Sequence, residues 1–280
     1  MPVAKPPYRT PIDNAHPLLR RLAAAGCSLR SFWTFQRNGG DEVVLAASSE
    51  VGHLKMGNTA VVAPDANQRN GRSVLVLDGQ VTTIASKNVA GRLAYQSPPV
   101  PVTVLGRFRV KVLPAGNCNI FNSAQSANYA GVFVQVGASG EILVNIGSNV
   151  GTSSTSRRTG TSAAVITAGT RYFDFGGVVR GNTDMTIRVD GVSLTPSYSG
   201  SASGLVYSTG VPTFGAVAST QLGANANVDY WMLLAGDVPV SLIDAIHADP
   251  WGLLVKPASH ARYAGAMASP ANTSAKMFFG

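Results

Sequence analysis

The feature that most constrains the fold is a long alternation of apolar and basic residues between positions 101 and 113, PVTVLGRFRVKVL. The apolar residues that would share one face of an extended strand are Val102, Val104, Phe108, Val110 and Val112. The basic residues that would share the other face are Arg107, Arg109 and Lys111. Alternation with a period of two predicts a strand with one face in a core and the other in solvent.

The rest of the chain between residues 29 and 235 also favours short strands. Charged residues make up only 13% of the sequence, while the 45% hydrophobic residues can supply a core. Turn sequences such as Asp78-Gly79 and Asp190-Gly191 separate the apolar runs. The predicted strands cover 29–35, 42–46, 73–77, 80–85, 131–136, 141–146, 161–167, 171–180, 184–189 and 192–194. Strand 80–85 is expected beside strand 73–77, and strands 131–136 and 141–146 are expected to form a hairpin. Residues 148–156 and 197–208 are predicted as loops, and the whole pattern predicts an all-β, two-sheet antiparallel sandwich.

The segment NANVDYWMLLAGDVPVSLIDAIHADPWGLLVK, residues 225–256, combines a strand with a helix. Its strand is apolar on both faces, which predicts that both are covered. Ser241 is the predicted N-cap of a helix over 242–248, Pro250 ends that helix, and a closing apolar strand follows. This is the one short C-terminal helix that the sequence predicts, and 16–25 suits either a short helix or a turn. The residues predicted to lock the sandwich are Trp231, Leu242, Ile246 and Trp251.

Basic residues gather at the two ends of a chain with a net charge of +8. Residues 1–30 hold five basic residues against Asp13, and residues 256–280 hold three with no acid. We expect an extended, proline-rich arm at 1–19, a jelly-roll body at 20–256 and an extended tail at 257–280. The basic residues predicted to contact a partner are Lys5, Arg9, Arg20, Arg21, Arg107, Arg109, Lys111, Arg262 and Lys276. The alternatives are that the charged ends only aid solubility, and that the strand charges only face water.

Three segments, in this order, carry a resemblance to a known family: HPLLRRLAAAGCSLRSFWTF, SVLVLDGQ and VDYWMLLAGDVPVSLIDAIHADPWGLL. Together they resemble the concanavalin A-like, laminin-G-like jelly rolls encoded among the virion structural genes of tailed bacteriophages. In that family an aromatic strand follows a His-Pro-Leu segment, and a strand, a helix and an Asp-Pro-Trp segment close the sandwich. The resemblance spans about residues 16–256 and implies a virion structural protein, made in the host cytoplasm.

Several kinds of chemistry lack the residues that they need. Glucanases of this fold require two carboxylates across a cleft, but Glu42, Glu50 and Glu141 all fall at turns or loops. None of His16, His53, His247 and His260 lies near a nucleophile elbow, and His247 is predicted to cap its helix. Calcium is common in laminin-G-like domains, which this sequence resembles, and Asp78 and Asp229 are the candidate calcium ligands. The alternative for Asp78 is that it only forms a turn with Gly79. We therefore predict no enzyme activity, no metal and no cofactor.

The remaining features bear on partners and compartment. No aromatic residues interleave with the basic strand face, which makes nucleic acid an unlikely partner. No apolar run is long enough to span a membrane, and the N-terminus lacks the apolar core of a signal peptide. Cys27 and Cys118 are expected to stay reduced. For a glycan, Tyr129, Tyr198 and Tyr207 fall in predicted loops, whereas Trp33, Trp231 and Trp251 suit a core.

The function predicted first is capsid decoration, in which a non-enzymatic sandwich docks on the major capsid protein or other virion subunits through its arms. We also expect it to form a homo-oligomer on the particle. The alternative is a tail or fibre component that binds a host-surface glycan.

Overall fold

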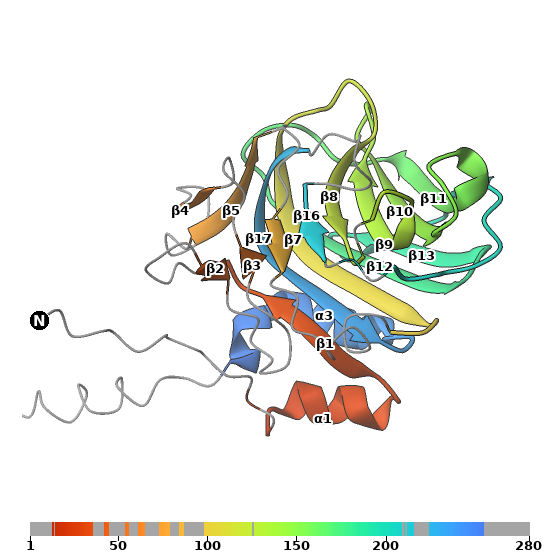
Figure 1. The fold of residues 1–280 in the computed structure, drawn as a ribbon. Helices are drawn as coiled ribbons and strands as arrows, with labels where there is room; N and C mark the ends of the chain where they lie inside the picture. The colour runs from red at the N-terminus through yellow and green to blue at the C-terminus, as the bar shows by residue number, and fades with distance from the viewer. Residues whose placement is uncertain are drawn as a thin grey trace, which may run out of the picture.

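The computed structural model shows two antiparallel sheets packed face to face, with two short helices outside one of them (Figure 1). The all-β sandwich predicted from the sequence is therefore confirmed. The structure describes residues 13, 15–35, 74–77, 98–124, 126–208, 210, 212–215 and 224–254, and the backbone alone at 42–44, 54–55, 61–64, 73, 78 and 84–86. Predictions about Lys5, Arg9, Arg262, Lys276, His53, His260 and Glu50 lie outside these residues.

One sheet has eight strands and is organised around its longest members. Its order is β14 (Val192–Leu194), β13 (Asp184–Val189), β12 (Phe173–Gly181), β7 (Val102–Val112), β17 (Asn225–Ala235), β5 (Ser73–Asp78) and β4 (Val61–Pro64). Strand β17 pairs with β7 along one edge, and its other edge is shared between β5 and β1 (Ser28–Trp33). Three strands thus pair with β17, which places this strand at the centre of the eight-stranded sheet.

The second sheet has nine strands and ends at a short edge strand. Its order is β15 (Ser197–Gly200), β11 (Arg157–Ala164), β10 (Glu141–Ser148), β9 (Ala130–Val136), β8 (Cys118–Asn122), β16 (Thr213–Phe214), β6 (Ile84–Ser86), β3 (Leu54–Lys55) and β2 (Glu42–Val44). The predicted hairpins β9–β10 and β13–β14 are confirmed. Two local predictions are wrong: β6 lies in this sheet rather than beside β5, and β15 occupies part of the predicted loop 197–208.

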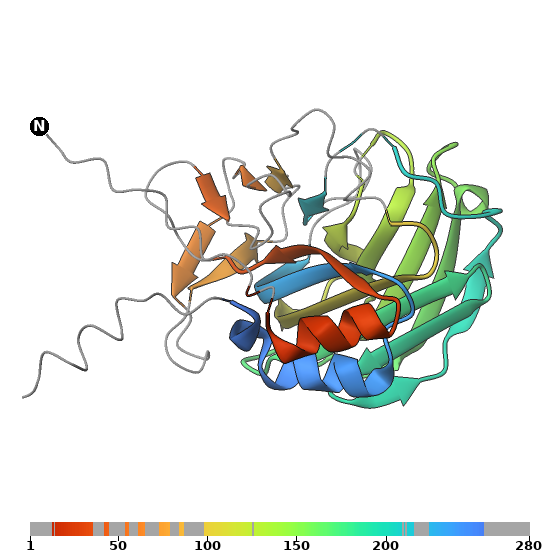
Figure 2. The same ribbon diagram turned by 90° about the horizontal axis from the view of Figure 1, so that it is seen from below.

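Two apolar layers hold the fold together. The inner layer lies between the sheets and centres on the Trp231 indole, which packs among four phenylalanine rings at centroid distances of 5.3 to 6.4 Å. The outer layer lies between the eight-stranded sheet and the helices α1 (Pro17–Ala24) and α3 (Val240–Ala248), which run side by side (Figure 2). Trp33 faces the inner layer and Phe32 the outer one, as their adjacent positions in β1 predict.

The helices of the outer layer differ from the predicted ones in number and in bounds. Helix α1 is formed in full, with His16 as its N-cap: the His16 ring accepts a hydrogen bond from the Leu18 N–H at 3.2 Å. Helix α3 begins at Val240 after Pro239, so Ser241 lies inside the first turn rather than at the cap. A 3-10 turn, η3 (Pro250–Leu253), replaces the predicted closing strand, because Asp249 caps it through the Gly252 N–H. A second 3-10 turn, η2, covers Ser154–Ser156.

A β-bulge at Asp229 reverses the face that β17 presents to the core. Val228 pairs with Phe108, whereas Tyr230 pairs with Arg107, so Asp229 has no partner in the ladder. Val228 therefore faces the inner layer, but Tyr230 faces the helices. An unbroken alternation would place Val228 and Tyr230 on the same face, but the one inserted residue moves every later side chain to the other face.

Strand β7 follows its predicted alternation only in part. Phe108 and Val110 are buried and Arg107 and Arg109 are half-buried, as expected. The first half of the strand is buried on both faces because the helices cover it, and at the far end Val112 is 58% exposed, contrary to the prediction. β7 lies between β12 and β17 and is not an edge strand, so its charged side chains do not serve to prevent edge-to-edge pairing with another sheet.

Candidate functional site

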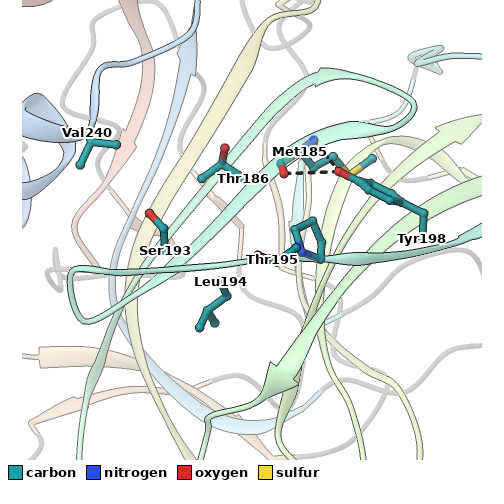
Figure 3. Close-up of a pocket in the computed structure, with 8 residues that line it drawn as sticks. Met185, Thr186, Ser193, Leu194, Thr195, Tyr198 and Val240 are labelled. Carbon is teal, nitrogen blue, oxygen red and sulfur yellow. Dashed lines mark hydrogen bonds between the residues drawn. The ribbon is translucent and has the colours of Figure 1, made fainter.

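A surface pocket of about 480 Å³ runs along β14, at the side of the sandwich where the eight-stranded sheet ends and β15 begins the other sheet (Figure 3). Its lining combines apolar side chains with hydroxyl groups. The lining residues are Met185, Thr186, Ser193, Leu194, Thr195, Pro196, Tyr198 and Val240. A volume in this range is typical of small-molecule sites.

Tyr198 joins the two sheets at one end of the pocket. Its hydroxyl accepts a hydrogen bond from the Met185 N–H at 2.9 Å, so a residue of β15 is tied to β13 of the other sheet (Figure 3). The guanidinium of Arg158 lies 5.5 Å from the ring centroid, which is cation–π range. A Cβ at Gly160 would stand 3.0 Å from the Met185 sulfur and 3.6 Å from the Tyr198 ring, so glycine permits this close approach.

Two hydroxyls in the pocket are oriented by arginines. Thr186 Oγ1 accepts a hydrogen bond from Arg180 at 2.9 Å, and Ser193 Oγ accepts one from Arg188 at 2.6 Å. A hydroxyl that accepts from a guanidinium keeps its own proton for a further bond. Both groups are therefore placed to donate to an acceptor oxygen of a ligand.

The two arginines are themselves fixed by carboxylates on other elements. Arg180 makes a two-pronged contact with Asp237 at 2.6 and 2.9 Å, and that hydrogen bonding raises the pKa of its guanidinium. Arg188, whose side chain is only 8% exposed, bonds Asp244 of α3 at 2.9 Å. Because Asp237 lies in the turn just before α3 and Asp244 lies within the helix, the same contacts hold the helix and orient the pocket hydroxyls.

A second polar cluster lies between α3 and the eight-stranded sheet. The His247 Nδ1 is hydrogen-bonded to the Tyr230 hydroxyl and lies 3.8 Å from Asp174, which in turn lies 3.6 Å from Arg107. Burial is the main cause of the pKa shifts of three groups in this cluster. It lowers the pKa of His247 to about 4, and it raises the pKa values of Asp174 and Tyr230. His247 is thus a neutral, packed side chain and does not cap its helix as predicted.

This burial makes a pH-dependent stability prediction. Histidine titrates near 6.5 when unfolded, so the unfolded chain binds more protons than the folded chain between that value and about 4. Stability should therefore fall as the pH is lowered, by about 2 kcal/mol between pH 7 and pH 5. Urea unfolding of the parent and of His247→Gln at both pH values measures this change in the free energy of unfolding, and most of the change should disappear in the variant.

A change in the free energy of unfolding that is equal in the two proteins would contradict the prediction. The other charged groups that face His247 are Asp244, Arg188 and Asp190, and they are unchanged in the variant.

The predicted basic face of β7 is partly engaged within the molecule. Arg107 pairs with Asp174, and Arg109 donates to the Gly169 carbonyl at 3.1 Å. Both guanidinium groups also lie about 6 Å from the centroid of the Tyr172 ring. Lys111 also interacts with another group of the protein. On α1, by contrast, Arg20 and Arg21 are exposed. Of the predicted partner-binding residues that the structure describes, three therefore lie on β7 and two on α1.

The four predicted lock residues fall in the two apolar layers. Trp231 is fully buried between the sheets, and Leu242 and Ile246 point from α3 into the outer layer. Trp251 is half-buried and packs against Phe32 and Tyr230 at centroid distances of 6.1 and 6.3 Å.

The other candidates considered from the sequence fall away from the pocket. The Glu141 carboxylate accepts from the Ser139 N–H within the β9–β10 turn, and Asp229 is buried in its bulge. Tyr129 stacks on Phe133, and the Tyr207 hydroxyl donates to the Pro98 carbonyl at 3.0 Å. Cys27 and Cys118 are free thiols whose pKa values are raised by burial. The side chains of Glu42 and Asp78 lie outside the described residues.

Within the described residues, no group of three or more His, Cys, Asp or Glu side chains gathers as a metal site would require. Nor is any described helix both long and apolar enough to cross a membrane.

Sequence reasoning identified Tyr198 but missed the hydroxyls beside it. The segment VSLTPSY was interpreted as a hairpin end followed by a low-complexity loop. The pocket depends on pairs such as Arg180–Asp237, which are 57 residues apart. The one local signal was the spacing of Thr186 and Arg188, which are two residues apart on β13 and therefore share a face of the strand.

Comparison with known proteins shows the fold only. No protein-family model matches the chain, and no curated protein matches it in sequence. Among solved structures, botulinum neurotoxin type C, whose cell entry depends on interaction with two ganglioside molecules, superposes with a TM-score of 0.54 and 10% identity. The match covers 82% of this chain and 52% of that chain.

Two further structures show the same architecture. The binding domain of botulinum neurotoxin DC in complex with rat synaptotagmin II gives a TM-score of 0.52 at 11% identity, over 79% of this chain and 51% of that one. A Trypanosoma rangeli sialidase gives 0.50 at 11% identity, over 77% of this chain and 32% of that one. The chain thus spans about half the length of the neurotoxin chains that it matches. The protein has a concanavalin-like β-sandwich of the jelly-roll type.

Proposed function

We propose that this chain is a non-enzymatic structural protein of a tailed-phage particle whose sandwich binds a host-surface carbohydrate in the β14 pocket. The observation that carries the proposal is that one pocket is lined by Tyr198 and by two hydroxyls, those of Thr186 and Ser193, that arginines hold in place. Sugars are bound by such combinations, since an aromatic or apolar side chain packs on C–H groups while fixed polar groups bond the hydroxyls.

Two further points support this function. The sequence segments at 16–35, 73–80 and 228–254 resemble virion proteins of tailed phages, which supports a role on the particle. Similar folds occur in a neurotoxin that depends on ganglioside for cell entry and in a neurotoxin binding domain in complex with SialylT. A sialidase shares the fold as well, so the absence of catalysis is part of the proposal and is tested by incubating the protein with the glycans that it binds.

The test is glycan binding by the full chain and by a variant with a filled pocket. Thr195 is exposed and lines the pocket, so Thr195→Trp should abolish binding while leaving the fold intact. The matched control is Val150→Trp, because Val150 is 76% exposed and is not part of the pocket lining. Binding on a glycan array that persists in Thr195→Trp would place the site elsewhere.

Capsid decoration remains a second candidate because one observation favours it. The Asp13 N–H donates to the Leu253 carbonyl at 2.9 Å, so the described body begins and ends at one place. The basic residues that precede Asp13 and those that follow Leu253 are therefore attached to the body at one place. Segments attached at one place suit simultaneous contact with neighbouring virion subunits.

Removing residues 1–12 tests the arms without touching α1. If the chain decorates capsids, the shortened protein should keep its fold and lose binding to purified capsids. Full stoichiometric binding by the shortened protein would rule out a role for that arm.

A further inference from the structure

Two hydroxyls of the β14 pocket are held as hydrogen-bond donors toward a ligand. Thr186 Oγ1 bonds the Arg180 guanidinium at 2.9 Å, and Ser193 Oγ bonds the Arg188 guanidinium at 2.6 Å. A guanidinium carries only donors, so the hydroxyl is the acceptor in each pair. No described residue accepts the proton of either hydroxyl. Each proton is therefore available to a ligand, and the bond from the charged guanidinium polarises the hydroxyl and strengthens its donation.

The two donors lie on one face of the eight-stranded sheet. Ser193 pairs with Arg188 across β13 and β14, and Thr186 is two residues from Arg188 on β13. Residues two apart on a strand share a face, and so do residues paired across strands. That face is the one covered by α3, because Arg188 bonds Asp244 of the helix. The donors thus point to the side of the pocket where Val240, the first residue of α3, lies (Figure 3).

Most of the remaining lining is apolar or already bonded. Val240 is 45% exposed, so its methyl groups are accessible to a ligand. The Tyr198 hydroxyl is occupied, because it accepts from the Met185 N–H at 2.9 Å. Thr195 adds one more hydroxyl, and the other apolar lining residues are Met185, Leu194 and Pro196. The pocket therefore presents two fixed donors beside an apolar side chain.

The charges next to the lining are balanced. Three guanidinium groups face three carboxylates: those of Arg158, Arg180 and Arg188, against those of Asp184, Asp237 and Asp244. The direction of hydrogen bonding and the apolar contacts are therefore the features that select a ligand.

An acetamido group on a sugar matches these features better than a sugar hydroxyl does. Its carbonyl oxygen has two lone pairs and no proton, so it can accept from two donors at once, and its methyl group lies next to that carbonyl. Packing of the methyl group on Val240 would remove apolar surface from water. A sugar hydroxyl in the same place is a weaker acceptor and leaves Val240 exposed.

We therefore propose, resting on the glycan-binding function above, that the β14 pocket takes an N-acetylated sugar. The acetamido carbonyl accepts from the hydroxyls of Thr186 and Ser193, and the acetamido methyl group packs on Val240.

The experiment compares glycans that differ only in whether the terminal sugar carries a 2-acetamido or a 2-hydroxyl group. N-acetylgalactosamine is compared with galactose and N-acetylglucosamine with glucose, each titrated into the full chain. We expect the acetamido group to tighten binding by about ten-fold in the series that the pocket binds. The preference should shrink toward one in Thr186→Val and in Ser193→Ala. The matched control is Ser199→Ala, which removes an exposed hydroxyl of β15 outside the pocket lining and should keep the preference.

The outcomes separate this inference from the function on which it rests. Equal binding of the acetamido and hydroxyl glycans, blocked by Thr195→Trp, would overturn the acetamido selectivity and leave glycan binding in place. An acetamido preference that survives in Ser193→Ala and Thr186→Val would also overturn it, because these donors would not be its cause. Ser193 is exposed, so its variant decides this point even if Thr186→Val fails to fold. A chain that binds no glycan of either kind would overturn both the inference and the function.

Discussion

Replacing Gly106 with alanine is expected to destabilise the protein by about 3 kcal/mol, at the upper end for an overpacked core. A Cβ at this position would lie 2.1 Å from Cε3 of the Trp231 ring and under 3 Å from two other ring atoms. The ring has little room to move, because it stacks on Phe175 at 5.7 Å and packs against Phe108, Phe121 and Phe214. Urea unfolding measures the change as a lower midpoint with an unchanged slope.

The matched control is Gly181→Ala at the end of β12. No heavy atom lies within 4 Å of a Cβ built at Gly181, and its backbone needs no left-handed conformation. This variant should stay within about 0.5 kcal/mol of the parent. Similar midpoints for the two variants would show that the Trp231 ring does not lie over Gly106.

Replacing Ile246 with aspartate is expected to cost about 4 kcal/mol or more and to detach α3 from the sheet. Ile246 is fully buried among Phe32, Tyr230 and other apolar side chains of the outer layer. An unpaired carboxylate there either stays charged in an apolar layer or must bind a proton, and both options destabilise the folded state. Unfolding by urea, together with near-ultraviolet circular dichroism of the tryptophans, measures the effect.

Ser241→Asp provides the control on the same helix. Ser241 is exposed in the first turn of α3, where a carboxylate is favoured by the helix dipole. This variant should match the parent within about 0.5 kcal/mol. Native-like stability in Ile246→Asp would mean that α3 does not lock the sandwich. The same measurement bears on ligand binding, because α3 carries Asp244 and Val240, which orient and line the pocket.

The candidate site was harder to predict than the fold. The alternation at 102–110 and the turns at 137–140 and 190–191 report local geometry, and they led to strands that the structure contains. The pocket instead brings together Tyr198 from one sheet, Ser193 from the other and Val240 from a helix. No local pattern encodes that meeting, because it depends on which strands end at the same side of the sandwich.

The sequence by itself determined the all-β class, the hairpins and a covered strand at 225–235, since each of these follows from side-chain periodicity and turn chemistry over a few residues. Only the tertiary structure decided how those strands pair, where the bulge at Asp229 reverses the faces of β17, and which arginines orient the pocket hydroxyls. The physical reason is that pairing and ion-pair geometry are set by contacts between residues far apart in the chain. The free energy of such contacts depends on the whole packed arrangement and not on any one segment.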